Sequence, residues 1–438
     1  MSMDSFFMLL AWIDTIYWSY IGFVLVLCAG LYFTLRSRFF QFSTLYHMPT
    51  HIRDIIHSAK EHQYGVHPLR LYFASVGGMV GLGNIVAVVT VVTIGGPGGI
   101  FWLWVASFLG MIIKYCEIYL GVKYRVKNDK GGYDGGPMYF LQAAFRGRGM
   151  PIAAAIFLMI YGVEISQFTI LTDTFSNLFH IHRLWVVVLL LALVLYSNVG
   201  GIARVAAWCS ILMPPFMLGY IIACIWVICL HGDVLVRIVG EIIPSAFSGH
   251  AALGGFAGST WLMAASAGTA RAVYSGDIGI GYDATVQSET RLVSPVKQAR
   301  IAVLALLSDT LICTCSCLVI LVTGLWYSAE QMQLSEYVRT ALMPHVPYVH
   351  LWLPAAFFIA GFTTIIGYFS VGMKAAHFLN QRYGRKLYMG YGCIAFIVFS
   401  FCEQSQVLTI MSIAGGLLVL CNLTGLLCLR KEISFKNE

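Results

Sequence analysis

The chain carries little charge and has no long polar stretch. Only 11% of its 438 residues are Asp, Glu, Lys or Arg, whereas a typical soluble domain has about 25%. Hydrophobic residues make up 59% of the chain, and the mean hydropathy is +0.78. No polar stretch exceeds about 35 residues, which is shorter than an independent domain. This composition excludes a large soluble domain and predicts an integral membrane protein.

The sequence also lacks the signatures of common catalytic and metal sites. It contains no GxSxG or HExxH stretch and no paired catalytic acids beside a base, which argues against an enzyme. A nucleotide-binding loop is excluded as well, because no glycine-rich segment has a Lys-Ser/Thr ending or a preceding strand. All twelve cysteines fall in apolar runs, so a disulfide framework in the loops is excluded, and zinc-ligand spacing is absent. We therefore expect no cofactor.

Eleven apolar runs of roughly 20 residues are present, the length that a helix needs to cross a bilayer. The runs do not alternate between polar and apolar residues, which favours helices over a β-barrel. The first run has no basic segment and no small-residue cleavage site, so it is expected to be a retained helix. The runs lie near residues 15–35, 69–95, 99–122, 151–175, 184–199, 205–230, 250–281, 299–326, 350–379, 387–402 and 407–429.

Lys and Arg residues are distributed unevenly among the segments between the runs. If the N-terminus is outside, the inside segments hold 22 of them, the outside segments hold 3, and two lie within runs. The positive-inside rule then predicts an outside N-terminus and a cytoplasmic C-terminus. The net charge of +7 is therefore a signal of topology. No clustered basic face or binding module indicates nucleic acid.

Two of the runs are interrupted in their middles by glycine and polar residues. GGMVGLGN at 77–84 interrupts the second run, and YSGDIGIGYD at 274–283 interrupts the seventh. Because these runs lie five apart, runs 2–6 and 7–11 form two five-helix halves of opposite orientation. Paired interruptions at matching places indicate the binding site of a secondary transporter. The expected fold is an all-α membrane protein of about 11 transmembrane helices, a 5+5 inverted repeat plus one extra N-terminal helix.

Glycine lets a helix unwind inside a membrane, and unwinding frees backbone N–H and C=O groups. Freed groups are costly in lipid unless a polar partner fills the gap. Amides at the N-terminus of a half-helix attract a carboxylate, and carbonyls at a C-terminus attract an ammonium or Na⁺. Close helix packing through Gly77-x-x-x-Gly81 is the alternative interpretation.

Motifs spread over most of the chain resemble those of one transporter family. GLGNIVAV (81–88), GGPGGIFWLWV (95–105) and KYCEIYLGVKYR (114–125) are similar to its signature of runs 2 and 3. Further similar stretches are GGPMYF (135–140), GGIAR (200–204), GGFAGST (254–260), RAVYSGDIGIGYDA (271–284), SPVKQARIAVLALLSDTLICT (294–314) and FTTIIGYFSVG (362–372). The family is that of the alanine/glycine:cation symporters, with a leucine-transporter type of inverted-repeat fold. The resemblance implies uptake of alanine, of either hand, or glycine, driven by Na⁺ through alternating access.

The sequence departs from this family's pattern in runs 7 and 9. The family typically has Ser-Asn-Glu-Ala-Gly where residues 275–279 read Ser-Gly-Asp-Ile-Gly. Gly367 is followed by Tyr368, where the family tends to have Trp. These departures do not affect the expected fold, but they leave the substrate, the coupling ion and the stoichiometry open.

The resemblance and the interruptions together indicate a substrate site. Amides of run 2 and the Asn84 side chain are expected near the substrate carboxylate. Asp277, an acid within the membrane and so a functional candidate, is expected to meet the substrate ammonium, to carry a proton or to pair with Arg271. Helix–helix hydrogen bonding by Asn84 and simple packing by the aromatic residues are the alternatives. The predicted substrate-site residues are Gly77, Gly78, Gly81, Gly83, Asn84, Gln167, Tyr274, Ser275, Asp277, Gly279 and Tyr368.

Thr363 and Thr364 in run 9 resemble the hydroxyl pair that completes a Na⁺ site in this fold. Carbonyl oxygens of Gly77 and Val80 are expected to supply the other ligands, because hard cations prefer oxygen. Hydroxyls that bond back to their own helix are the alternative. H⁺ coupling with Asp277 as the carrier is the alternative to Na⁺.

Two charged features complete the expectations. Lys114 and Glu117 are three residues apart, so they are expected to pair on one helix face. Asp309 is expected to have a structural or gating role.

The chain is expected to be one transmembrane domain over residues 1–438. Its parts are an extra helix and loop at 1–68, five-helix repeats at 69–230 and 250–429, and a cytoplasmic tail at 430–438. We expect it in the inner membrane, with an amino acid, Na⁺ or H⁺ and the lipid bilayer as its partners and no obligate protein partner.

Overall fold

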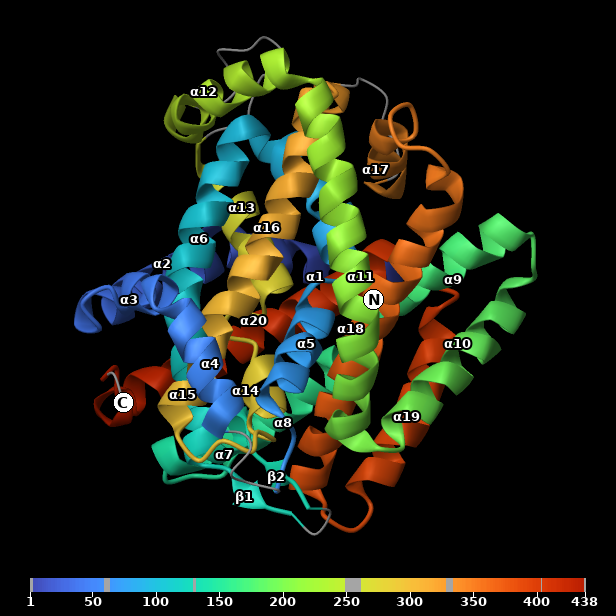
Figure 1. Ribbon diagram of the computed structural model, residues 1–438. Coiled ribbons are helices and arrows are strands. Elements are labelled where there is room, and N and C mark those ends of the chain that lie inside the picture. The colour runs from blue at the N-terminus through green and yellow to red at the C-terminus, as the bar shows by residue number, and fades with distance from the viewer. Residues whose placement is uncertain are drawn as a thin grey trace.

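The computed structural model describes residues 3–58, 64–128, 131–248, 261–327, 334–402 and 404–436. The GGFAGST stretch at 254–260 and the start of the expected seventh run lie outside these residues. Within them the structure is almost entirely helical (Figure 1). The strands β1 (Val126–Lys127) and β2 (Tyr133–Asp134) form one short antiparallel pair, with Val126 opposite Asp134.

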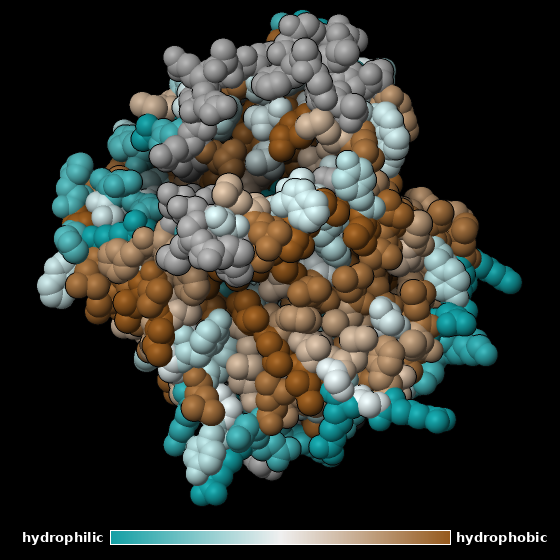
Figure 2. Space-filling view, turned by 180° about the vertical axis from the view of Figure 1, so that it is seen from behind, coloured by the Kyte–Doolittle hydropathy of each residue, from teal (hydrophilic) through white to brown (hydrophobic). Residues whose placement is uncertain are grey.

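Seven helical segments in the described residues are long and apolar enough to cross a membrane. The face of the molecule in Figure 2 is largely hydrophobic in its middle, and hydrophilic residues gather along its lower edge. The fold class is therefore that of a multi-pass all-helical membrane protein. The seven segments are Phe7–Arg36, Val89–Lys123, Gly149–Phe179, Gly201–Leu230, Pro295–Val322, Val349–Leu379 and Gln406–Cys428.

These segments are built from the following helices, given in chain order. They are α1 (Met3–Ile16), η1 (Tyr17–Gly22) and α2 (Phe23–Arg36); α6 (Val89–Lys123); α8 (Gly149–Tyr161) and α9 (Ile165–Phe179); α11 (Gly201–Leu230); α15 (Pro295–Ala299) and α16 (Ile301–Val322); α18 (Val349–Leu379); and α20 (Gln404–Cys428). Shorter helices lie beside them in the bundle, namely α5 (Pro68–Met79), η2 (Gly83–Ala87), α10 (Arg183–Asn198), α13 (Trp261–Gly276), α14 (Tyr282–Gln287) and α19 (Gly384–Phe399).

Helix α6 contains a sharp turn near its start. Gly96 has φ 56° and ψ −153°, a conformation open almost only to glycine, and Pro97 follows it. The residues of α6 before this turn continue the helical stretch of η2, and the residues after it form the long part of α6. The predicted boundary between runs 69–95 and 99–122 falls at this turn.

Short helices and the strand pair cover the two ends of the bundle (Figure 1). The strands, α7 (Pro137–Ala144) and α15 lie at the lower end in that view, and α12 (Gly232–Ser248) and α17 (Leu334–Leu342) lie at the upper end. The remaining short elements are α3 (Phe40–Tyr46), α4 (Met48–Ser58), η4 (Leu325–Tyr327) and η5 (Arg430–Glu432).

Candidate substrate and ion site

The first interruption lies between α5 and η2. α5 ends at Met79, and Val80 has φ −83° and ψ 75°, outside the helical region. Helical backbone resumes with η2 at Gly83. A Cβ on Gly81 would lie 2.6 Å from Oγ1 of Thr364, which is well inside normal non-bonded contact. Close approach of another helix therefore requires glycine at this position.

The second interruption lies between α13 and α14. Asp277, Gly279 and Gly281 have φ of 51°, 79° and 97°, and this left-handed conformation costs a non-glycine residue roughly 1 kcal/mol or more. The Asp277 carboxylate offsets that cost by capping α14. Its Oδ1 accepts the N–H of Tyr282 at 3.3 Å, and its Oδ2 accepts the N–H of Asp283 at 2.9 Å.

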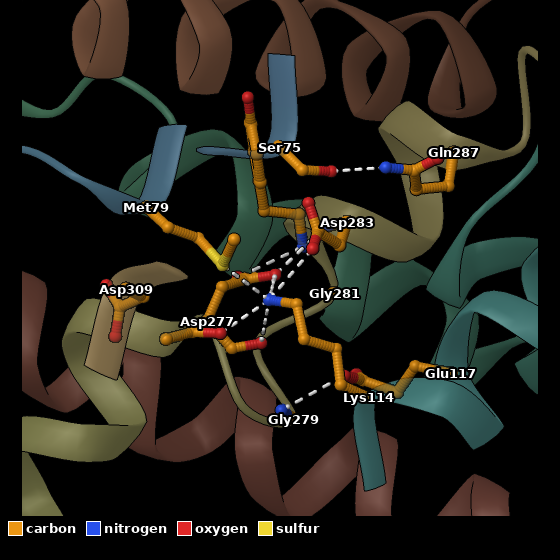
Figure 3. A network of polar contacts seen from close by, with 12 residues as sticks. Ser75, Met79, Lys114, Glu117, Asp277, Gly279, Gly281, Asp283, Gln287 and Asp309 are labelled. Carbon is orange, nitrogen blue, oxygen red and sulfur yellow. Dashed lines mark hydrogen bonds and ion pairs between the residues drawn. The ribbon is translucent and has the colours of Figure 1, made fainter. Parts of the chain in front are cut away.

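Lys114 on α6 reaches into this second interruption (Figure 3). Its ammonium lies 2.9 Å from Oδ2 of Asp283 and 3.5 Å from Oδ2 of Asp277. It also donates to the carbonyl oxygen of Gly276 and lies 3.0 Å from the sulfur of Met79 on α5. One buried ammonium thus connects α6, α5 and the 277–281 segment.

Glu117, one turn further along α6, holds the same segment at another point. Its Oε2 accepts the N–H of Gly279 at 3.0 Å. The ion pairs of Lys114 go to Asp277 and Asp283, so the expected Lys114–Glu117 pair is replaced by contacts across to the interrupted helix. Asp277 therefore pairs with Lys114 rather than with Arg271, which is the partner that the sequence suggested.

Asn84, Ser275 and Asp309 form a second buried cluster. The Asn84 side-chain amide donates to Oδ1 of Asp309 at 2.5 Å, and the Ser275 hydroxyl donates to Oδ2 at 3.0 Å. Asp309 lies on α16, so this carboxylate joins a residue from each interrupted region. The predicted site residues Asn84 and Ser275 thus both hydrogen-bond the Asp309 carboxylate, a contact that the sequence did not predict.

The two predicted threonines on α18 behave differently. The Thr364 hydroxyl lies 3.1 Å from the carbonyl oxygen of Gly77 and 3.0 Å from that of Ala360. The Thr363 hydroxyl bonds its own helix at Ile359, 2.8 Å away, and lies 3.5 Å from the sulfur of Met213. Of the two threonines, Thr364 is the one whose hydroxyl hydrogen-bonds α5, near the point where Val80 ends the helix.

Gln167 on α9 supports the first interruption from the other side. Its Oε1 accepts the N–H of Leu82 at 3.0 Å. The same oxygen would lie 3.3 Å from a Cβ on Gly81. Gln167 is thus placed at the predicted site, where it satisfies one of the amides that unwinding frees.

The remaining predicted glycines of the first interruption are packed against residues from other helices. A Cβ on Gly77 would lie 2.7 Å from the sulfur of Cys209, and Gly78 lies against the ring of Tyr282. A Cβ on Gly83 would lie 3.2 Å from a terminal nitrogen of Arg271. The glycines of this stretch therefore do two things: they allow close packing of other helices, and they lie where the helix is interrupted.

The two predicted tyrosines lie on different sides of the second interruption. Tyr368 stacks on Tyr282 with ring centroids 4.3 Å apart, and its hydroxyl donates to Oδ1 of Asp277 at 3.2 Å. The Tyr274 hydroxyl instead bonds Ser412 on α20, and its ring lies 4.9 Å from that of Trp18. Tyr368 therefore belongs to the Asp277 cluster, whereas Tyr274 contacts η1 and α20.

Sequence reasoning did not assign Lys114, Tyr282 and Asp283 to this site. Lys114 could have been found, because a lysine within an apolar run is costly and so marks a functional candidate. Tyr282 and Asp283 are the last two residues of the predicted interruption at 274–283, but nothing in the sequence indicated which groups they would contact. The turn at 277–281 brings Asp283 to Lys114 on α6.

A large cleft opens at the lower end of the bundle, beside the strand pair. It has a volume of about 1440 Å³ and is lined by residues of the β1–β2 region, α7, α8, α11, α18 and α19. Lys374 on α18 lies at this cleft, 3.2 Å from Asp134 and 2.6 Å from Glu289. This network joins three elements at the edge of the molecule.

Comparison with known proteins identifies the family. Residues 3–436 match the sodium:alanine symporter family. The chain belongs to this family. The resemblance seen in the sequence is confirmed, and the family consists of transporters rather than enzymes.

Individual relatives of the family cover nearly the whole chain. An uncharacterized transporter of Haemophilus influenzae is 31% identical over 97% of this chain and 94% of its own. The sodium/alanine symporter AgcS of Methanococcus maripaludis is 27% identical over 95% of this chain and 93% of its own. Among solved structures, the manganese transporter of Eremococcus coleocola has a TM-score of 0.56 at 16% identity, covering 88% of this chain and 82% of its own. That likeness supports a transporter fold.

Proposed function

We propose that this member of the sodium:alanine symporter family couples the entry of Na⁺ to the uptake of alanine or glycine. Thr364 carries the proposal. Its hydroxyl lies 3.1 Å from the carbonyl oxygen of Gly77 and 3.0 Å from that of Ala360, and oxygen atoms are the ligands that hard cations prefer. A Na⁺ bound there would tie α18 to the interrupted α5, so the ion would favour one arrangement of these helices.

The substrate is proposed to bind between the two interruptions. Arg271 lies beside Gly83 at the start of η2, and the described residues offer it no ion pair. Its guanidinium suits a carboxylate, and amides of the first interruption add to that attraction. The predicted residues Gly77, Gly78, Gly81, Gly83, Asn84, Gln167, Tyr274, Ser275, Asp277, Gly279 and Tyr368 remain the proposed surroundings.

The topology proposed for transport has eleven crossings. They are the seven long segments together with α5–η2, α10, α13–α14 and α19. The first repeat would run from α5 to α11 and the second from α13 to α20, each opening with an interrupted helix. This arrangement supports an inverted repeat that rocks around the site, with the N-terminus outside and the end bearing β1 and β2 in the cytoplasm.

H⁺ coupling through Asp277 is the alternative. The two Asp277 oxygens accept from the N–H groups of Tyr282 and Asp283 and from Tyr368, and one of them also faces Lys114. These contacts hold the carboxylate against α14, α18 and α6. We therefore assign Asp277 to holding the interruption rather than to carrying a proton.

The test is uptake of labelled alanine and glycine into proteoliposomes under an imposed Na⁺ gradient at equal pH. Thr364→Val removes the hydroxyl at Gly77, and Thr363→Val is its matched control, because that hydroxyl bonds its own helix. We expect Na⁺-driven uptake in the parent, a loss of the Na⁺ drive in Thr364→Val and a much smaller change in Thr363→Val. Equal effects of the two changes would exclude the proposed ion site, and no uptake would exclude the substrate.

A further inference from the structure

Glu164 lies at a further helix break, in the middle of the expected run 151–175. α8 ends at Tyr161 and α9 begins at Ile165, and Glu164 between them has φ 50° and ψ 46°. This left-handed conformation disfavours residues other than glycine, and strained residues of this kind concentrate at functional sites. An acid within a membrane-spanning segment is itself a functional candidate. Backbone and charge therefore single out the same residue.

The Glu164 carboxylate has no partner among the described residues. The residue is only 4% exposed, yet its side chain accepts no hydrogen bond from the start of α9 and forms no ion pair. The other buried acids of the described residues each have a hydrogen-bond donor or an ion pair, namely Glu117, Asp134, Asp277, Asp283, Glu289 and Asp309. Because a buried charge without a partner is strongly unfavourable, Glu164 calls for a cationic ligand.

Arg271 on α13 is the cation whose charge acts on Glu164. The two side chains form no ion pair with each other, and Nε of Arg271 is buried without a hydrogen-bond partner among the described residues. The contact of the guanidinium is with the ring of Tyr274, 5.8 Å from its centroid. An acid and a base thus attract each other across the interior without touching.

Both side chains belong to the surroundings of the first interruption. Glu164 precedes Gln167 by one turn on α9, so the two lie on one helix face, and Gln167 accepts the N–H of Leu82. From the other side, a terminal nitrogen of Arg271 lies 3.2 Å from where a Cβ on Gly83 would be. α9 and α13 therefore bring the acid and the base to the proposed substrate site.

Asp277 is less suited to a substrate ammonium than Glu164. Its two oxygens already accept the N–H groups of Tyr282 and Asp283 and the hydroxyl of Tyr368, and Lys114 faces one of them. A substrate ammonium would have to displace one of these donors. The Glu164 carboxylate offers its oxygens without such a loss.

We propose that Glu164 binds the ammonium group of the substrate while Arg271 binds its carboxylate. An α-amino acid carries these two opposite charges on one carbon atom, so it supplies the missing partner of both side chains through charge-assisted hydrogen bonds. Glu164 then selects amino acids over hydroxy acids of the same shape. The inference rests on the proposed transport function and assigns the ammonium to Glu164 instead of Asp277.

The experiment measures how well the site distinguishes alanine from lactate, which has a hydroxyl in place of the ammonium. Unlabelled alanine or lactate competes with labelled alanine for uptake into proteoliposomes under a Na⁺ gradient. The ratio of their half-inhibitory concentrations does not depend on how much protein is incorporated. In Glu164→Gln we expect the KM for alanine to rise about tenfold to a hundredfold and the preference for alanine over lactate to fall by a similar factor. The Na⁺ concentration for half-maximal uptake at saturating alanine should stay unchanged.

Three further variants test whether the effect comes from the charge. Glu164→Asp keeps the carboxylate and should recover part of the preference for alanine. Asp173→Asn makes the same chemical change on α9 at a partly exposed acid that pairs with Arg183 at 3.1 Å, so it is the matched control and should keep the parent KM. Glu164→Gly relieves the left-handed conformation and should raise the unfolding temperature while raising the KM as Glu164→Gln does. Lower unfolding temperatures in both Glu164→Gly and Glu164→Gln, with an unchanged KM, would show a structural role instead.

The outcomes separate this inference from the proposed function. If the parent takes up alanine with Na⁺ but Glu164→Gln keeps the parent KM and the parent preference over lactate, the inference is excluded and the symporter stands. A changed Na⁺ requirement with an unchanged alanine KM would assign Glu164 to the ion and also exclude the inference. If the parent takes up neither alanine nor glycine, the proposed function fails, and the inference fails with it.

Discussion

Two lysines in this protein each bridge two carboxylates, but in different surroundings. Lys114 joins Asp277 and Asp283 in the middle of the bundle with no exposed side-chain surface. Lys374 joins Asp134 and Glu289 beside the large cleft, with 9% of its side chain exposed. Lys114 therefore cannot change its ion-pair partners unless the surrounding helices move. The Lys374 network lies at the wall of the cleft, with slightly more exposed side chains than the Lys114 cluster.

The surroundings also set the balance of charge at each lysine. At the cleft, Glu289 accepts the N–H of Tyr133 and Asp134 accepts from Asn128, so both acids have further donors. Burial alone would raise the pKa of Asp134, but the Lys374 ammonium, helped by the Asn128 amide, holds it below the ordinary value. At Lys114, Glu117 and Asp283 each keep an oxygen without a donor. A lysine between two carboxylates thus lies in a fully hydrogen-bonded network at the cleft, whereas the acids around Lys114 keep oxygen atoms without a hydrogen-bond donor.

Removing the two ammonium groups should have the largest effect and should separate the two regions. Lys114→Met leaves three buried carboxyl groups without a counter-ion, and we expect a loss of about 3 to 5 kcal/mol in stability together with loss of uptake. Lys374→Met should cost about 1 to 2 kcal/mol, because water at the cleft partly replaces the ammonium. Thermal unfolding in detergent and alanine uptake measure both. Equal losses of stability in the two variants would show that burial does not distinguish the two lysines.

Exchanging lysine for arginine should sharpen the same contrast. The Lys114 ammonium fits between a carbonyl oxygen, a sulfur atom and two carboxylates. A planar guanidinium is larger and has a different donor geometry, so Lys114→Arg should abolish uptake. Lys374→Arg should keep most of the uptake, because the cleft has room and a guanidinium also binds two carboxylates. Retained transport in Lys114→Arg would contradict the close fit assigned to that ammonium.

The ion pair between Lys374 and Asp134 at the cleft should weaken in acid. Because the folded-state pKa of Asp134 is lowered, its contribution is fully present above the ordinary carboxyl pKa and is lost as the pH falls through the lower folded value. The stability difference between the parent and Asp134→Asn should therefore shrink below about pH 4. Thermal unfolding across a pH series measures it. In a Lys374→Met background this stability difference should change less with pH, because the Lys374 ammonium, the main cause of the lowered Asp134 pKa, is gone.

A third lysine pair, at the surface, should give the smallest effect. Lys123 lies 2.7 Å from Glu432, with side chains 34% and 41% exposed. Exposed ion pairs contribute at most about 1 kcal/mol, so Lys123→Met should leave uptake unchanged and shift the unfolding temperature little. A loss comparable to that of Lys374→Met would mean that the tail, which Lys123 contacts through Glu432, has a role in holding the bundle closed.

Sequence reasoning predicted part of this architecture correctly and missed part of the site. The apolar runs and the interruptions at 77–84 and 274–283 follow from local composition, because glycine in an apolar run signals a helix that need not continue. Helical spacing, however, suggested that Lys114 would pair with Glu117. A spacing of three shows that two side chains can meet, but a side chain turns toward whatever neighbouring helix supplies better partners.

What the sequence determined by itself is the class of the protein and the places where its helices break. Low charge and long apolar runs require a membrane, and the glycines at 77–84 and 274–283 permit unwinding there. Only the tertiary structure decided which groups fill those interruptions. The contacts between Lys114 and Asp283, Thr364 and Gly77, and Asn84 and Asp309 join residues far apart in the chain. Such contacts depend on how whole helices pack, and no local pattern in the sequence encodes that packing.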